Sequence, residues 1–143
     1  GDVTLSDVQV TDDLAATYSG ATGFTVNNVT SAGFTVNFPG YDGDTDITML
    51  DTGQTLNPGQ SKTIQVSVTV TTGGNLGPYN NQAEATGASP ASTVVDDLSD
   101  NGVNPDPNGN NDAGDANEDD PTPVDFDEGP AIGVAYETIE PLR

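Results

Sequence analysis

An acidic stretch in the second half of the chain, residues 96–120, has the residue types and spacing of a cation site. It contains nine carboxylates, no Lys and no Arg. Hard cations such as calcium bind six to eight oxygens at roughly 2.3–2.6 Å, supplied by Asp, Asn and backbone carbonyls on a tightly turning chain. The candidate ligands alternate along two short runs, and Gly109 allows the first run to turn. We predict that calcium orders this loop through Asp96, Asp97, Asp100, Asp106, Asn108, Asn110, Asp112, Asp115, Asn117, Asp119 and Asp120.

Two other interpretations of these acidic residues remain open. A segment with so little apolar surface cannot offset the entropy of ordering by itself, so a solvated linker is the alternative to a calcium loop. The stretch is not an EF-hand, because it lacks a Glu at the twelfth loop position and flanking helices. A shorter acidic turn, formed by Asp42, Asp44 and Asp46, is a second candidate cation site, although turns of this kind more often use Asp to cap the backbone.

Alternating apolar and polar residues predict that these loops are held by β-strands. The clearest strand covers residues 61–72, where Ile64, Val66, Val68 and Val70 share one face. In residues 3–10 the alternation changes phase at Ser6-Asp7, which predicts a β-bulge. Further strands are predicted over 24–29 and 34–38, joined by a turn at 31–33, and over 79–87 (with Ala83 and Ala85 inward), 91–96, 124–127 and 131–139.

Several short strands with turns every 8–12 residues and no helical stripe predict an all-β fold, specifically an immunoglobulin-like Greek-key sandwich. We expect residues 1–128 to form this sandwich, with the acidic loop 96–120 as part of it. Residues 129–143 are then a C-terminal linking or donor strand.

The composition excludes several classes of function. The net charge is −21, from 23 acids against Lys62 and Arg143, which argues against nucleic acid and anionic membrane surfaces as partners. The absence of Cys and His removes thiolate metal sites and the commonest general base. The carboxylates lie in polar loops, where they suit cation binding better than acid catalysis, so we expect no enzyme. The sequence contains no apolar run near 20 residues in length, so no segment is predicted to insert into a membrane.

Four segments taken together resemble a known family: GDVTLSDVQVTDDL, LNPGQSKTIQVSVTVT, YNNQAEATG and DDLSDNGVNPDPNGNNDAGDANEDDPTPVDF. In this order they resemble one unit of the tandem repeat of bacterial cell-surface proteins called domain of unknown function eleven. The resemblance covers most of residues 1–128. It implies an immunoglobulin-like sandwich in a large secreted or wall-attached protein, without enzymatic activity.

The register of this chain differs from that of the repeats. The strands that open such a repeat are missing before GDVTLSDVQV, and the tail GPAIGVAYETI resembles the opening strand of a following repeat. A sandwich lacking a strand leaves an unpaired edge and an apolar groove, which a strand from another subunit can fill. We therefore predict a head-to-tail homopolymer that forms an extracellular bacterial filament or surface array, with Ile132, Val134, Tyr136 and Ile139 as the partner-strand residues.

Other functions are compatible with the same residues. The chain could be one period of a longer array, as a spacer or adhesive repeat of a single-chain surface protein, or a carbohydrate-binding accessory module. Carbohydrate binding calls for exposed aromatic rings, and Tyr18, Tyr41 and Tyr79 are the candidates. Residues 131–139 could also be an ordinary edge strand. Asn28, in Asn28-Val29-Thr30, is a candidate glycosylation site.

Overall fold

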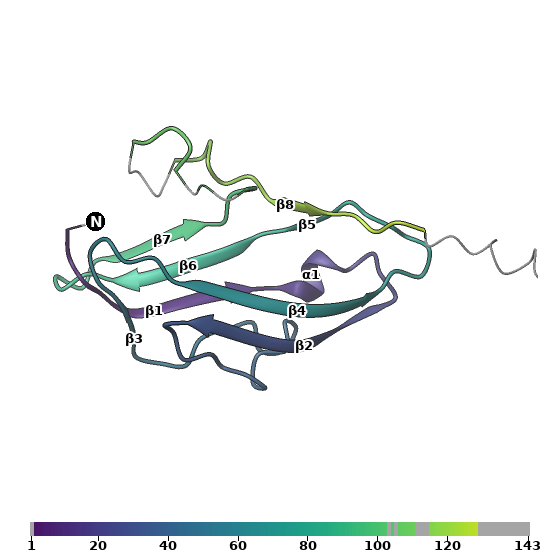
Figure 1. The fold of residues 1–143 in the computed structure, drawn as a ribbon, viewed down its shortest axis with the longest axis horizontal. Coiled ribbons are helices and arrows are strands. Elements are labelled where there is room, and N and C mark those ends of the chain that lie inside the picture. The colour runs from purple at the N-terminus through teal and green to yellow at the C-terminus, as the bar shows by residue number, and fades with distance from the viewer. Residues whose placement is uncertain (1, 103, 105, 111–114, 129–143) are drawn as a thin grey trace, which may run out of the picture.

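The structure is a computed structural model that describes residues 2–102, 104, 106–110 and 115–128. The described residues form antiparallel β-strands and one short helical turn (Figure 1), which confirms the all-β prediction. The elements are β1 (Leu5–Asp12), α1 (Leu14–Thr17), β2 (Gly23–Ala32), β3 (Gln54–Leu56), β4 (Thr63–Thr71), β5 (Tyr79–Asn81), β6 (Ala83–Ala88), β7 (Val94–Leu98) and β8 (Thr122–Val124).

The strands form one larger sheet and two two-stranded sheets. The larger sheet has the order β3-β1-β6-β7 and is antiparallel throughout. β2 and β4 form a long antiparallel pair, and β5 pairs with β8. Because only Gln82 separates β5 from β6, the β5–β8 ribbon continues the line of β6 (Figure 1). This arrangement is compatible with a β-sandwich.

β1 contains the β-bulge that its sequence predicts. Its register with β3 shifts between Leu5 and Val8, and Asp7 has a φ of 51°. The extra residue changes the phase of the alternation, so that Val8 becomes buried and Val10 packs against the core. β1 ends at Asp12, after which the chain turns into α1.

β4 has the predicted alternation, and its partner β2 is adapted to it by a second bulge. The apolar residues of β4 (Ile64, Val66, Val68 and Val70, called here the inner face of β4) are half-buried, whereas the residues between them are exposed. The register of β2 shifts between Val26 and Asn28. This shift lets Phe24, Val26 and Val29 all pack toward the core.

The hairpin predicted between residues 24–29 and 34–38 is wrong. β2 pairs with β4, and within 34–38 only Val36 makes a bridge, to Leu50. The side-chain amide of Asn37 donates to the carbonyl of Thr48 at 3.0 Å, and Lys62 Nζ lies 4.2 Å from the ring centroid of Phe34. Around the Val36 bridge, the backbone N–H of Asn37 donates to the carbonyl of Met49 and that of Asp51 donates to the carbonyl of Thr35.

Three further strand predictions need adjustment. The strand expected over 79–87 is divided into β5 and β6 at Gln82, and Ala85, expected inward, is exposed. The strand expected over 91–96 is displaced to β7. The strand expected over 124–127 is displaced toward the N-terminus, to β8. The strand expected over 131–139 lies outside the described residues.

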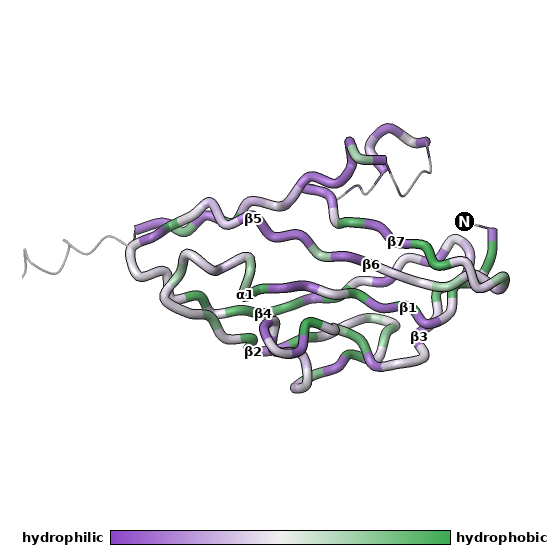
Figure 2. Tube along the Cα trace, turned by 180° about the vertical axis from the view of Figure 1, so that it is seen from behind, coloured by the Kyte–Doolittle hydropathy of each residue, from purple (hydrophilic) through white to green (hydrophobic). Residues whose placement is uncertain are grey.

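The core lies between the β2–β4 pair and the larger sheet, near α1. Its buried residues are Leu14, Tyr18, Val29, Tyr41, Met49 and Tyr79. The rings of Tyr18 and Tyr79 meet edge to face at 5.4 Å, and Tyr79 meets Phe126 at 6.0 Å. Figure 2 shows that hydrophobic segments from β1, β2 and β4 border this region. In the part of the chain that the structure describes, no helix has the length and apolar character needed to span a membrane.

Candidate functional site

The two alternating runs of the acidic loop come together around one carboxylate, that of Asp115. Its Oδ2 accepts hydrogen bonds from Nδ2 of Asn108 at 3.0 Å and Nδ2 of Asn110 at 3.1 Å. Its Oδ1 accepts from the backbone N–H of Asn117 at 3.0 Å. The hydrogen bonds from Asn117 are the main cause that lowers the pKa of Asp115, so this carboxyl stays ionised.

The first run also folds on itself in the way its spacing predicts. The backbone N–H of Asn110 donates to Oδ1 of Asp106 at 3.0 Å and to Oδ1 of Asn108 at 2.8 Å. Gly109 has a φ of 74°, a left-handed conformation that glycine adopts without strain. Side chains of both runs are therefore joined in one network of hydrogen bonds.

Glu118, which is absent from the predicted ligand set, is the most buried of the described carboxylates of this loop, with 6% of its surface exposed. Its Oε1 accepts from the backbone N–H of Asn108 at 3.4 Å, a long hydrogen bond that links the two runs. A buried carboxylate among other acids is electrostatically costly unless a positive charge or further donors face it.

Gln82 fastens the base of the acidic loop to the sheet. It lies at the break between β5 and β6, and its Nε2 donates to the backbone carbonyl of Asp119 at 2.6 Å. The neighbouring N–H of Ala83 donates to Oγ of Ser99 at 3.0 Å. These two contacts hold both ends of the loop against the same point of the β5–β6 line.

Like charges crowd the place where β7 meets the returning loop. Burial raises the pKa of Asp97, and the negative charges of Asp119, Glu118 and Asp96 raise it further. These carboxylates come from opposite ends of the loop, so the fold brings negative charges together that are far apart in the sequence. A bound cation would relieve this repulsion.

The predicted ligands do not all enter one cluster. The loop region collects Asp106, Asn108, Asn110, Asp115 and Asn117, whereas Asp96 and Asp97 lie on β7. Asp100 accepts from the N–H of Asn101, Asp119 and Asp120 lie on the returning segment, and Asp112 is outside the described residues. Among described residues there is no group of three or more His, Cys, Asp or Glu placed to hold a metal ion. Calcium binding therefore stays a prediction.

The shorter acidic turn is organised by hydrogen bonds to its own backbone. Oδ1 of Asp42 accepts from the N–H groups of Asp44 and Asp46, each at 2.9 Å, and Oδ2 accepts from the hydroxyl of Thr45. These bonds, led by that of Thr45, lower the pKa of Asp42 to about 2. The hydrogen-bonded turn has the geometry of the capping alternative, and a cation role for Asp42, Asp44 and Asp46 stays untested.

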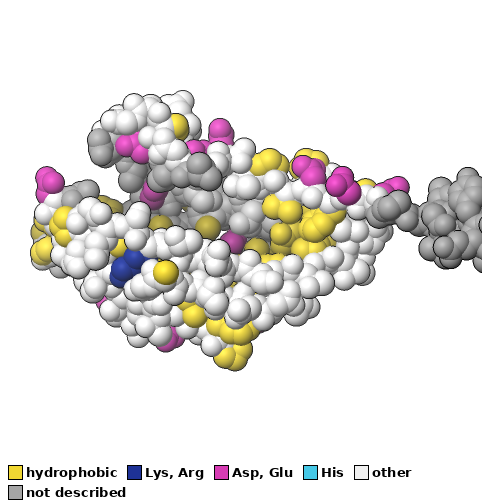
Figure 3. Space-filling view, viewed as in Figure 1, with side chains coloured by type: hydrophobic (Ala, Val, Ile, Leu, Met, Phe, Trp, Pro, Cys, Tyr) yellow, Lys and Arg dark blue, Asp and Glu magenta, His cyan; other side chains and the backbone are white. Residues whose placement is uncertain are grey.

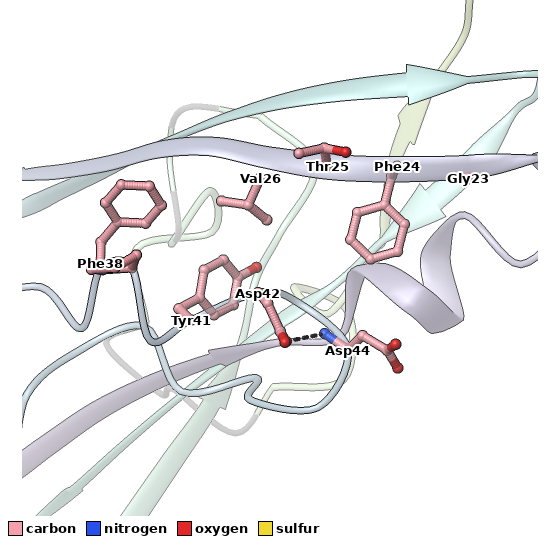
Figure 4. Close-up of a pocket in the computed structure, with 9 residues that line it drawn as sticks. Gly23, Phe24, Thr25, Val26, Phe38, Tyr41, Asp42 and Asp44 are labelled. Carbon is pink, nitrogen blue, oxygen red and sulfur yellow. Dashed lines mark hydrogen bonds between the residues drawn. The ribbon is translucent and has the colours of Figure 1, made fainter.

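A cleft of about 490 Å³ lies beside this turn, between β2 and the segment that carries Phe38 and Tyr41 (Figure 4). The ring of Tyr41 forms part of the cleft wall, but its hydroxyl donates to the carbonyl of Asp12 at 3.2 Å and the residue is only 1% exposed. Tyr18 and Tyr79 are also buried. The three tyrosines considered for carbohydrate stacking are thus core residues.

The side of the sandwich between β4 and the β5–β8 ribbon is incompletely covered. The inner face of β4 packs against the core, yet all four of its residues are only half-buried. Val124 and Phe126, which pack against the same core, are also half-buried. Figure 3 shows hydrophobic side chains gathered in a hollow on this side. Within the described part of the chain, β4 pairs along one edge only, with β2.

A second apolar opening lies on the larger sheet. It is a cavity of about 230 Å³ whose lining includes Leu5, Val8, Leu56 and Val95 of β7. Val95 is 43% exposed, and its neighbour Val94 is 67% exposed. Apolar surface is therefore left uncovered at the edge of this sheet as well.

Comparisons with protein-family models, with curated proteins and with solved structures found no match. The resemblance to the bacterial surface repeat consequently stays a prediction, and the site is argued from its geometry.

Sequence reasoning missed Gln82 and the burial of Glu118, because neither residue belongs to an alternating run. It identified β4 as a strand but did not mark it as an edge, because a long strand without charge, Pro or Gly is typical of a central position in a sheet. Asn28 is exposed on β2, so a sugar there would not meet the core, and its glycosylation is untested. The predicted partner-strand residues Ile132, Val134, Tyr136 and Ile139 lie outside the described residues.

Proposed function

We propose that the protein is a structural subunit of an extracellular bacterial filament or surface array, built by β-strand exchange and stiffened by calcium. The observation on which this proposal rests is the half-exposed inner face of β4 beside an edge that no described strand covers. A sandwich that is complete within one subunit normally covers its core and protects its edge strands against pairing. This one leaves both open at the same place.

Strand addition would supply what this side lacks. A strand along β4 would satisfy the backbone groups of the free edge and turn alternate side chains toward the core. Each aliphatic or aromatic side chain that becomes fully buried contributes roughly 1.5–3 kcal/mol. The tail has the matching pattern, because Ile132, Val134 and Tyr136 alternate with smaller or polar residues.

The positions of the first and last described residues fit a linear assembly. Residue 2 and residue 128 lie at opposite ends of the long axis (Figure 1). A chain that enters at one end and leaves at the other can be repeated head to tail without closing, which generates a fibre. In the proposed assembly each domain is an immunoglobulin-like Greek-key sandwich, and residues 129–143 are its link to the next.

Calcium is proposed to hold the acidic loop. The fit rests on the donor chemistry: Asn108 and Asn110 hydrogen-bond to the carboxylate of Asp115, Asn108 also to Glu118, and Asn110 also to Asp106. Rotating an Asn amide by 180° exchanges its nitrogen for its oxygen, so residues that now donate to Asp115 can present oxygen to a cation. When bound, calcium would supply the positive charge that the crowded carboxylates lack.

Electron microscopy of the purified 143-residue chain tests the proposed function. We expect filaments from the intact chain in calcium and only small particles from a chain lacking residues 131–139. The matched control is a chain with Glu137→Gln and Glu140→Gln, which removes two charges from the tail and keeps its apolar pattern. This variant should still assemble. An intact chain that remains monomeric at high concentration in calcium would contradict the proposal.

A spacer or adhesive repeat of a long single-chain surface protein is the second candidate. The opposite placement of residues 2 and 128 favours it equally, because tandem domains also join end to end (Figure 1). In that case the tail would belong to a covalently attached neighbour. The isolated chain would then stay monomeric, and a polypeptide of two consecutive copies would be more stable per domain than one.

A further inference from the structure

The described sheets have several edges, and they differ in how well they are protected against pairing with another strand. β3 and β8 have three residues each, and β8 contains Pro123. β7 carries Asp96 and Asp97. β2 is bent by the bulge next to Asn28. Short length, proline, charge and bulges are the devices that keep natural edge strands from accepting partners.

β4 has none of these protections. It extends over Thr63–Thr71 and contains no charged residue, no Pro and no Gly. Its register with β2 is continuous from Ile64 to Val66, and the single shift in this pair is a bulge in β2. A long, uncharged edge above half-buried valines is the type of edge that takes up a further strand.

We propose that β4 is the receiving edge of the assembly, and that residues 131–139 of a second copy lie along it, parallel to it. This inference rests on the proposed function and assigns its interface. The incoming side chains of Ile132, Val134 and Tyr136 enter the hollow bounded by the inner face of β4 on one side and by Val124 and Phe126 on the other.

The occupant is a second copy because of where the described chain ends. β8 leads away from the acidic loop toward the end of the molecule opposite residue 2 (Figure 1). A tail that continued in that direction would leave its own subunit. Extended, residues 129–143 span about 50 Å, against about 30 Å for the length of β4, so the tail is long enough to cover β4 of the next subunit.

The same direction sets the polarity of the added strand. β8 and β4 both run toward the end of the molecule where residue 128 lies (Figure 1). Subunits of a helical filament share one polarity along its axis. A tail that continues the direction of β8 therefore runs parallel to β4 of its neighbour.

Disulfide trapping tests this assignment cleanly, because the natural chain has no cysteine. One set of full-length chains carries a single Cys in place of Ile64, Val66, Val68 or Val70, and a second set, with a size tag, carries Ile132→Cys or Val134→Cys. Each pair is refolded together in calcium, oxidised and separated without reductant. Val94→Cys, on the exposed edge of β7, is the matched control receiver.

We expect a mixed disulfide dimer between the tagged donor chain and a receiver chain whose Cys lies on β4. The yield of mixed dimer with the Val94→Cys receiver should be at least tenfold lower. For parallel strands, the best receiver moves toward Val70 when the donor changes from residue 132 to residue 134; movement toward Ile64 would overturn the polarity. Trapping at Val94→Cys, or at no receiver, in samples that show filaments would overturn β4 as the receiving edge and leave the proposed function standing. The absence of both filaments and mixed dimers would remove the proposed function as well.

The chain's own tail is the remaining occupant that the experiment distinguishes. A chain carrying both Val68→Cys and Val134→Cys forms an internal disulfide at low concentration if its tail folds back on its own β4. An internal disulfide without any mixed dimer from the single-Cys chains would overturn the proposal.

Discussion

The side-chain amide of Asn81 donates to Oδ2 of Asp12 at 3.2 Å, while Oδ1 of the same carboxyl is buried with no hydrogen-bond partner in the described part of the chain. Asp12 is only 7% exposed and stands at the end of β1, beside the core. Burial raises the pKa of Asp12, the bond from Asn81 opposes this rise, and the charge of Asp13 adds to it. The ionised form of Asp12 therefore destabilises the folded state.

Asp12→Asn should stabilise the protein at pH 7 by about 1 kcal/mol, because it removes a buried charge with an unpaired oxygen. The pKa of Asp12 is higher in the folded state than in the unfolded state, so the folded state holds this proton more tightly. The destabilisation caused by ionised Asp12 is therefore absent below the unfolded pKa near 3.8 and develops as the pH rises through the raised folded value. The gain from Asp12→Asn should then vanish near pH 3, as measured by urea denaturation. Asp51→Asn, which removes an exposed charge that does not act on Asp12, is the control; an equal effect in both variants would refute the local origin.

Calcium should raise the melting temperature of the chain, and chelation should lower it. At a hundredfold excess of ion over Kd, one site contributes about 2.7 kcal/mol. Asp115→Asn removes the carboxylate at which both runs of the acidic loop meet and should abolish the calcium response. Asp51→Asn, an exposed residue outside both acidic segments, should leave it intact. Identical melting curves in calcium and in EDTA would rule out the metal site.

Gln82→Ala should loosen the acidic loop without disturbing the sheets. The substitution removes the 2.6 Å hydrogen bond to the carbonyl of Asp119, at a cost of roughly 1 kcal/mol. Proteolysis within residues 100–118 should become faster, while protease resistance of β4 stays unchanged. Gln65→Ala, on the exposed face of β4, is the matched control. If cleavage of the loop is equally fast in both variants, Gln82 does not fasten it.

Val68→Asp should prevent assembly, whereas Thr69→Ser, which adds no charge to the edge, should permit it. The two residues are neighbours on β4, but Val68 belongs to the half-buried inner face and Thr69 is exposed on the other face. A carboxylate at position 68 would have to lose its water when a strand covers the hollow. Light scattering reports assembly, and circular dichroism of the monomer checks that the Val68→Asp variant remains folded. Assembly by both variants to the same extent would contradict the proposed interface.

Sequence patterns correctly predicted the elements that depend mainly on residues close together in the chain. The phase break at Asp7 predicted the bulge of β1, and the regular alternation from Ile64 to Val70 predicted β4. The alternation at Phe34, Val36 and Phe38 predicted a strand that does not form, because pairing depends on distant residues and the chain positions β4, not this segment, beside β2. β3, with three residues, is too short to show a period at all.

The candidate site was predictable in composition but not in placement. Spacing indicated that the runs beginning at Asp106 and Asp115 would act together, and the structure joins them through Asn108 and Asn110. No local signal marks Asp12 as buried, because a pair of Asp residues at a strand end is typical of an exposed turn. Its burial follows from contacts with residues distant in the sequence: the hydroxyl of Tyr41 donates to the carbonyl of Asp12, and the side-chain amide of Asn81 donates to its carboxylate.

Amide hydrogen exchange in β4 is the most direct test of the claim that the sandwich is completed by another copy. Roughly half of the N–H groups of an edge strand point away from its one partner, so they exchange rapidly until a second strand covers them. The account predicts that peptides covering residues 63–71 gain protection when the intact chain assembles in calcium, and that a chain lacking residues 131–139 shows no such gain under the same conditions. Equal exchange of these peptides in the intact and shortened chains would contradict it.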